Sequence, residues 1–291
     1  MPVSQRTALL LLGAALLLPA GEPRGQQSQN PSPMVEHTRR HPRLAPREAP
    51  GRREPLLTGT LFIPEKSRAA RQAELFVHFH GAPWIAEAAV AGQKQAVLIS
   101  LQLGSGSGTY ARPFQDAELF GRLLSQAETT SGMRFTSLTL TAWSAGYGAI
   151  RAILGVPEYY RRADRVLLID GLHTGYRSGK PGPLESEIET ESLEIFLRFA
   201  RDAAEGRKRM LLVHTEIFPG TFASTTETAD FLLRQLQLVR RPVLRWGPMG
   251  SQQIGEARRG NFHLMNFAGN TAPDHVDLLH ALPEWVRMLR K

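Results

Sequence analysis

The 291-residue sequence contains no cysteine. Disulfide bonds, zinc sites built on thiolates and a cysteine nucleophile are therefore excluded. Without cysteine, the composition does not indicate an oxidising or a reducing compartment. Internal repeats and coiled-coil heptads are missing as well, which excludes a solenoid.

The positive charge lacks the arrangement that nucleic-acid binding requires. The formal net charge is +8, but Lys and Arg are scattered and form no basic stripe interleaved with aromatic residues. We interpret this charge as solvated surface charge and expect no nucleic-acid partner.

Long hydrophobic runs are missing, with one short exception at the N-terminus. An apolar run extends from Ala8 to Leu18, after Arg6 and before small and polar residues. A run this short favours a cleaved secretory signal over a helix that spans a bilayer. We predict a signal peptide at residues 1–21, an exported protein that is periplasmic or secreted, and no stable membrane anchor.

Residues 22–54 are rich in Pro, Gln, Ser and Arg and show no hydrophobic period. Such a segment buries too little apolar surface to offset its ordering entropy. We predict a flexible leader there. Residues 55–291 are then expected to form one catalytic domain, because the chain is too short for two ordinary domains and a linker.

Short apolar runs alternate with amphipathic segments over this domain, which predicts a mainly parallel central sheet with helices on both faces. An alternating edge strand is predicted at 56–63. Strands buried on both faces are predicted at 73–79, 96–101, 138–142, 166–169 and 210–213. Segments 242–246 and 263–267 both have strand character, and only one is needed to complete the parallel series.

The segment 171–208 connects two of these strands. Its first part is rich in Gly, Pro and Ser, and its length over a sheet edge predicts a short lid-like insertion. Residues 191–205 place their apolar side chains on one face and end before Gly206, which predicts a helix.

The residues around Ser144 predict a strand, a tight turn and a helix. The strand is 138–142, and residues 147–154 have the spacing of a buried helix. Ala142 and Gly146 stand two positions before and after the serine, where a strained turn requires small residues. The positive end of the helix points at the turn, so this position suits a nucleophile that gives rise to an oxyanion.

This turn resembles the Gly-x-Ser-x-Gly motif of the α/β-hydrolase superfamily, with Ala142 in place of the first glycine. His80 and Gly81, after the strand at 73–79, are similar to the His-Gly segment that follows an early strand in that superfamily. The resemblance implies an α/β-hydrolase fold and serine esterase chemistry through an acyl-enzyme, with no cofactor.

The resemblance also implies an oxyanion hole formed by the backbone amides of Ala82 and Ala145. Pro83 has no N–H and is expected to stiffen the loop. The residues around these amides are expected to line the substrate pocket, namely His80, Gly81, Trp84 and Trp143.

A serine needs a base, and the fold places the histidine last in the chain. His263 lies in a predicted strand and His280 in an apolar helical stretch, whereas His275 follows a loop and opens a helix. We predict His275 as the base, with His280 as the alternative.

The imidazole needs a carboxylate that holds its tautomer. Asp170 follows the strand beside the nucleophile strand, and Gly171 after it allows a sharp turn. Glu216 follows the next strand, where most members of the superfamily place their acid. We predict Asp170, with Glu216 as the alternative acid.

Two other functions remain open from the sequence. His78 and His80 lie on the same side of a strand, as in some metal sites, and a metal-dependent hydrolase is the first alternative. No Asp or further His follows within a few residues, so we expect no metal. The second alternative is a non-catalytic binding protein on the same fold. We expect a small-molecule or acylated substrate, and the sequence leaves the oligomeric state open.

Overall fold

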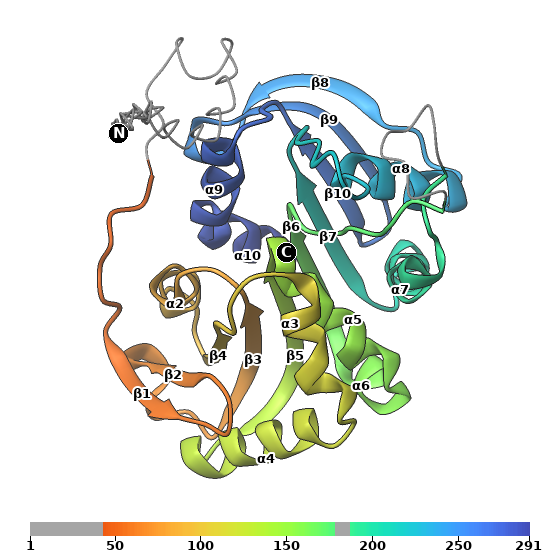
Figure 1. Ribbon diagram of the computed structural model, residues 1–291. Helices are drawn as coiled ribbons and strands as arrows, with labels where there is room; N and C mark the ends of the chain where they lie inside the picture. The colour runs from red at the N-terminus through yellow and green to blue at the C-terminus, as the bar shows by residue number, and fades with distance from the viewer. Residues whose placement is uncertain (1–42, 178–186) are drawn as a thin grey trace, which may run out of the picture. The chain divides into compact units, whose positions relative to one another are not determined.

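The computed structural model describes residues 43–177 and 187–291 (Figure 1). The predicted signal peptide at 1–21 and most of the predicted leader at 22–54 lie outside these residues. Within the described ranges, no helix is both long enough and apolar enough to cross a membrane.

A ten-stranded sheet with the order β1-β2-β4-β3-β5-β6-β7-β10-β9-β8 forms the centre of the described chain. Strands β3 to β7 and β10 run parallel, and the strands at both edges are antiparallel. This order, with a strand-turn-helix at the end of the central β5, is that of the α/β-hydrolase fold. The strands are β1 Gly51–Pro55, β2 Thr60–Pro64, β3 Gln72–Phe79, β4 Ala96–Leu101, β5 Arg134–Trp143, β6 Ala163–Ile169, β7 Arg209–His214, β8 Arg241–Trp246, β9 Gln252–Arg259 and β10 Phe262–Phe267.

Helices cover both faces of the sheet, as predicted (Figure 1). One apolar layer joins the sheet to α4, α5, α7 and α8, and the other joins it to α2, α9 and α10. The layers are separate because successive side chains of a strand point to opposite faces. The helices are α2 Pro83–Ala91, α3 Ser107–Ala111, α4 Leu119–Ser131, α5 Tyr147–Gly155, α6 Pro157–Arg162, α7 Glu194–Ala204, α8 Thr225–Gln235, α9 Ala272–His280 and α10 Leu282–Arg290.

Two predictions at the first edge of the sheet are wrong. The leader does not reach residue 54, because β1 begins at residue 51, and the strand predicted at 56–63 begins only at Thr60. The polar sequence of β1 contains no apolar run that would predict a strand. The strand pairs with β2 along its whole length, and its side chains make ion pairs, those of Arg53 with Glu48 and Glu87. The Arg53 guanidinium lies 4.9 Å from the ring centre of Phe62, and its Nε donates to Glu87 at 3.0 Å.

The other edge contains both strands that the sequence left as alternatives. Strand β10 pairs in parallel with β7 and completes the parallel series, whereas β8 lies beyond it and pairs antiparallel with β9. Strand β9 was not predicted, because its mostly polar residues contain no apolar run. Arg241 and Arg245 of β8 both bind Glu256 of β9, so cross-strand ion pairs join these two strands.

The predicted helix at 191–205 is present as a short 3-10 turn at Glu191–Leu193 followed by α7. Phe196, Phe199 and Ala200 are fully buried against the sheet. This half of the segment 171–208 therefore belongs to the core and is not a lid. Residues 178–186 lie outside the described part of the chain.

Candidate active site

Ser144 occupies a strained backbone position directly after β5. Its φ is 48°, in the left-handed region that non-glycine residues rarely adopt. The chain then forms a 3-10 turn at Ser144–Gly146 and continues into α5. A Cβ at Gly146 would lie 2.2 Å from the carbonyl oxygen of Phe79, at the end of β3. The turn therefore needs glycine at this position, as the sequence pattern indicates.

The loop after β6 touches the backbone of Ser144. Trp143 is in register with Ile169, so Ser144 and Asp170 leave neighbouring strands side by side. A Cβ at Gly171 would lie 2.1 Å from the carbonyl oxygen of Ser144. The absence of a side chain at this glycine lets the two loops meet backbone to backbone.

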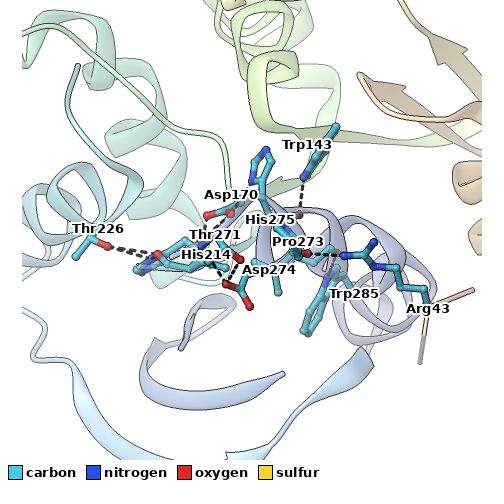
Figure 2. Close-up of polar contacts among 12 residues, drawn as sticks. Arg43, Trp143, Asp170, His214, Thr226, Thr271, Pro273, Asp274, His275 and Trp285 are labelled. Atoms are coloured by element: carbon cyan, nitrogen blue, oxygen red, sulfur yellow. Dashed lines mark hydrogen bonds and ion pairs between the residues drawn. The ribbon is translucent and has the colours of Figure 1, made fainter. Parts of the chain in front are cut away.

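The structure brings His275 and Asp170 together (Figure 2). His275 Nδ1 lies 2.7 Å from Asp170 Oδ2. An ionised carboxylate only accepts hydrogen bonds, so the proton of the neutral imidazole is on Nδ1 and Nε2 is free to accept another. Asp170 itself has a φ of 46°, and this backbone turn follows β6 directly.

Thr215, at the end of β7, supplies two further hydrogen bonds to Asp170. Its backbone N–H donates to Oδ1 at 2.9 Å and its hydroxyl donates to Oδ2 at 2.8 Å. Asp170 is 4% exposed. Burial raises its pKa, but the hydrogen bond and charge of His275 and the bonds from Thr215 outweigh burial, so the pKa lies below its usual value.

The two alternatives from the sequence lie elsewhere. The Glu216 carboxylate accepts a hydrogen bond from Asn266 Nδ2 and makes none to His275. Burial raises the pKa of Glu216, which is the opposite of the shift at Asp170. His280 lies edge-on to the ring of Trp84, with 5.6 Å between ring centres, and its buried Nδ1 has no partner among the described residues.

Trp143 links the nucleophile turn to the histidine. Its indole N–H donates to the backbone oxygen of His275 at 3.0 Å, and the two ring centres are 4.5 Å apart (Figure 2). The ring of His80 stacks on the same indole at 5.0 Å and is nearly parallel to it. These contacts bring His275 beside the residue that precedes Ser144. Within the described chain, no hydrogen bond joins Ser144 to His275, a bond that unliganded active sites often form only with substrate.

The two backbone amides that the resemblance implies for an oxyanion hole belong to Ala82, just before α2, and to Ala145, which follows Ser144 directly. The Ala145 N–H lies in the first turn of a helix and has no partner within that helix. The Ala82 N–H, just before α2, donates to none of the described residues, whereas the neighbouring Gly81 N–H donates to Gln102 Oε1 at 2.8 Å.

A pocket of about 550 Å³ opens beside the serine. Ser144 and Ala145 form part of its wall, together with Ser107, Tyr147, Arg151, His173, Thr174 and Phe222. The four residues predicted to line the pocket are not among those that line it, namely His80, Gly81, Trp84 and Trp143. Trp143 and His80 instead lie on the side of His275. No motif marks the residues that line this pocket, because they come from separate segments of the chain.

His78 and His80 lie next to different partners in the described chain. His78 is buried and lies 2.8 Å from Thr141 Oγ1, and burial lowers its pKa to about 4. The φ of His80 is 71°, which turns it out of the strand toward the Tyr110 hydroxyl at 2.8 Å. Across the described residues, no three or more His, Asp or Glu side chains come together as a metal would require.

No known family model matches the sequence, and neither does any curated protein. Solved structures with a similar fold include an esterase from Thermogutta terrifontis, 14% identical, with a TM-score of 0.48 over 82% of this chain and 91% of that one. An acylaminoacyl peptidase from Pyrococcus horikoshii is 11% identical, with a TM-score of 0.47 over 84% of this chain and 41% of that one. The carboxylesterase CesB from Bacillus subtilis is 11% identical, with a TM-score of 0.40 over 84% and 90%. By its own strand order and by the place of Ser144 after β5, the chain has the α/β-hydrolase fold.

Proposed function

We propose that the protein is a serine hydrolase that cleaves an ester or a related acyl bond through Ser144, His275 and Asp170. The observation that carries the proposal is the 2.7 Å hydrogen bond between His275 and Asp170, at the loop whose backbone touches Ser144. A structural histidine would not need a buried carboxylate with two further donors beside a strained serine.

In the proposed reaction, His275 Nε2 takes the hydroxyl proton of Ser144 while Oγ attacks the acyl carbon. The carbonyl oxygen becomes an oxyanion, and the amides of Ala82 and Ala145 donate to it. The intermediate collapses to an acyl-enzyme, and the leaving alcohol takes the proton from His275. In the second half of the reaction, His275 takes a proton from water, whose oxygen attacks the acyl carbon. The bond to Oγ then breaks, the acid is released, and His275 returns the proton to Ser144.

Asp170 keeps the imidazole in the tautomer that this reaction needs. Its lowered pKa means that it stays ionised and stabilises the imidazolium that forms when Ser144 loses its proton. Thr215 assists because its two hydrogen bonds favour the ionised carboxylate.

The decisive experiment compares Ser144→Ala with the wild type on a short-chain aryl ester. We expect turnover to fall by roughly 10⁴-fold or more, because the nucleophile is lost while the turn accepts the smaller side chain. Ser137→Ala, a change in the same strand β5 but away from the turn, serves as the matched control and should retain turnover. In parallel, a serine-directed phosphonate should add its mass to the wild type and not to Ser144→Ala. Unchanged turnover in Ser144→Ala would overturn the proposal.

A further inference from the structure

Arg151 differs from every other half-buried arginine of the described chain. Each of the others makes a hydrogen bond or ion pair with a polar group of the protein, namely Arg53, Arg165, Arg209, Arg240 and Arg290. The guanidinium of Arg151 has no such partner among the described residues and lies only over the ring of Tyr147, 5.8 Å from its centre. A partly buried cation without an anion is costly, so this one is available to a ligand.

The free guanidinium lies in the pocket that contains the nucleophile. Ser144, Tyr147 and Arg151 all line that pocket. Tyr147 and Arg151 are four residues apart in α5 and therefore share one face of the helix. Arginine side chains in helices point back toward the N-terminus, and the contact with the Tyr147 ring has this direction. The charged group is therefore directed toward the end of α5 that follows Ser144.

The rest of the pocket does not cancel this charge. The other polar side chains that line the pocket include His173 and the hydroxyls of Ser107, Thr174 and Ser192, the last two 2.9 Å apart. Glu189 also lines the pocket, but it is exposed and makes no ion pair with Arg151. The inner wall thus combines a nucleophile, hydroxyl groups and one unpaired cation.

We infer that the preferred substrates are esters with an anionic group, such as a carboxylate, in the half of the molecule that occupies this pocket, where Arg151 binds it. This inference rests on the proposed serine hydrolase function. The planar guanidinium suits a carboxylate because it donates two parallel hydrogen bonds. Arg151 lies one to two turns of α5 beyond Ser144, and its side chain reaches back toward that end of the helix. The anion is therefore expected on the order of 6 Å from the scissile carbonyl.

The experiment uses two pairs of esters that differ only by methylation of a carboxylate. The first pair is 4-nitrophenyl hemiadipate and its methyl ester, in which the acyl half bears the charge. The second pair is 4-acetoxybenzoate and its methyl ester, in which the alcohol half bears it. For each pair, the ratio of kcat/KM for the anionic ester to kcat/KM for the neutral ester is measured in full-length wild type, Arg151→Gln, Arg151→Lys and Arg134→Gln.

In the wild type, the ratio for at least one pair should exceed one, and that pair identifies which half enters the pocket. Arg151→Gln should lower this ratio by about tenfold, because a charge-assisted hydrogen bond is lost. Arg151→Lys should keep part of the preference. Arg134→Gln should keep all of it, because this exposed arginine starts β5 at the end of the strand opposite Ser144 and controls for net charge.

Other outcomes contradict one idea or both. If the neutral esters are hydrolysed and the ratios in wild type and Arg151→Gln are equal, the inference about Arg151 is wrong while the serine hydrolase function stands. If the wild type hydrolyses none of the four esters, both are overturned.

Discussion

The ends of β6 and β7 each carry a carboxylate, and only one of them serves the candidate base. Asp170 follows β6 and accepts hydrogen bonds from His275 and from both donors of Thr215. Glu216 follows β7 and accepts one side-chain bond, from Asn266. Burial raises the pKa of both carboxyl groups, but only at Asp170 do the donors outweigh burial.

In the proposed triad, the acid is therefore the carboxylate with more hydrogen-bond donors, and not the one at the strand end where the superfamily usually places it. The end of β7 still takes part, because Thr215 donates across to Asp170. The two strand ends therefore have different roles. One presents the carboxylate, and the other holds it in place and favours its ionised form.

The largest expected difference in kcat is between two variants, each of which removes the negative charge at one of the two strand ends. Asp170→Asn should lower kcat on an aryl ester by about 10³ to 10⁴-fold, because the imidazole loses its tautomer control and its counter-ion. Glu216→Gln has the same change in shape and charge and should alter kcat by less than about threefold, since Glu216 does not touch His275. A larger loss in Glu216→Gln than in Asp170→Asn would reverse the comparison.

An intermediate effect is expected from the hydroxyl that joins the two strand ends. Thr215→Val removes the bond to Asp170 Oδ2 but keeps the backbone bond to Oδ1. Losing one hydrogen bond to a charged group should lower kcat by about tenfold. Thr215→Ser retains the hydroxyl and is expected to behave like the wild type. If steady-state kinetics show equal rates for Thr215→Val and Thr215→Ser, the hydroxyl does not support Asp170.

The smallest expected effect is on the free energy of unfolding in acid. The group at the end of β7 and the group at the end of β6 should change this free energy over different pH ranges. His214, at the end of β7, is buried, and burial followed by the charge of Arg240 lowers its pKa to about 4. As the pH falls from about 6.5 to 4, the unfolded chain binds a proton here that the folded chain does not, so the free energy of unfolding decreases. Asp170 has a lowered pKa, so the stability it contributes is lost only as the pH falls below its usual value of 3.8.

Urea denaturation at a series of pH values measures the free energy of unfolding over both pH ranges. In His214→Gln, the decrease in unfolding free energy between pH 6.5 and 4 should be shallower than in the wild type by up to about 1.4 kcal/mol per pH unit, the equivalent of one proton. In Asp170→Asn, the slope should change only at lower pH. Identical slopes for wild type and His214→Gln between pH 6.5 and 4 would show that this histidine titrates normally in the folded state.

Much of this arrangement follows from the sequence because it depends on local patterns. The turn at Ser144 is predicted by small residues at fixed offsets from one position, and the buried parallel strands by short apolar runs. Asp170 is predicted because it follows such a run, and His275 because it follows a loop and opens a predicted helix.

The rest depends on contacts between distant segments that leave no local pattern. Thr215 lies 45 residues from Asp170 in the chain, and nothing in its neighbourhood marks it as a donor. Strands β1, at one edge of the sheet, and β9, next to the other edge, consist mostly of polar residues, and such sequences resemble those of loops. Arg151 is one of many arginines, and its significance appears only when the partners of the others are known.

Gly146 and Gly171 are positions that substitutions cannot easily change, unlike the side chains of the pocket wall. A side chain at either glycine would collide with a neighbouring backbone oxygen, at Phe79 or at Ser144 itself. The reactive turn is thus specified by main-chain contacts, whereas the pocket wall is made of side chains such as Tyr147 and Arg151. If all these positions are randomised and active variants are selected, glycine should be retained at 146 and 171, whereas many residues should be accepted at 147 and 151. New substrate preferences could then arise while the turn at Ser144 stays unchanged.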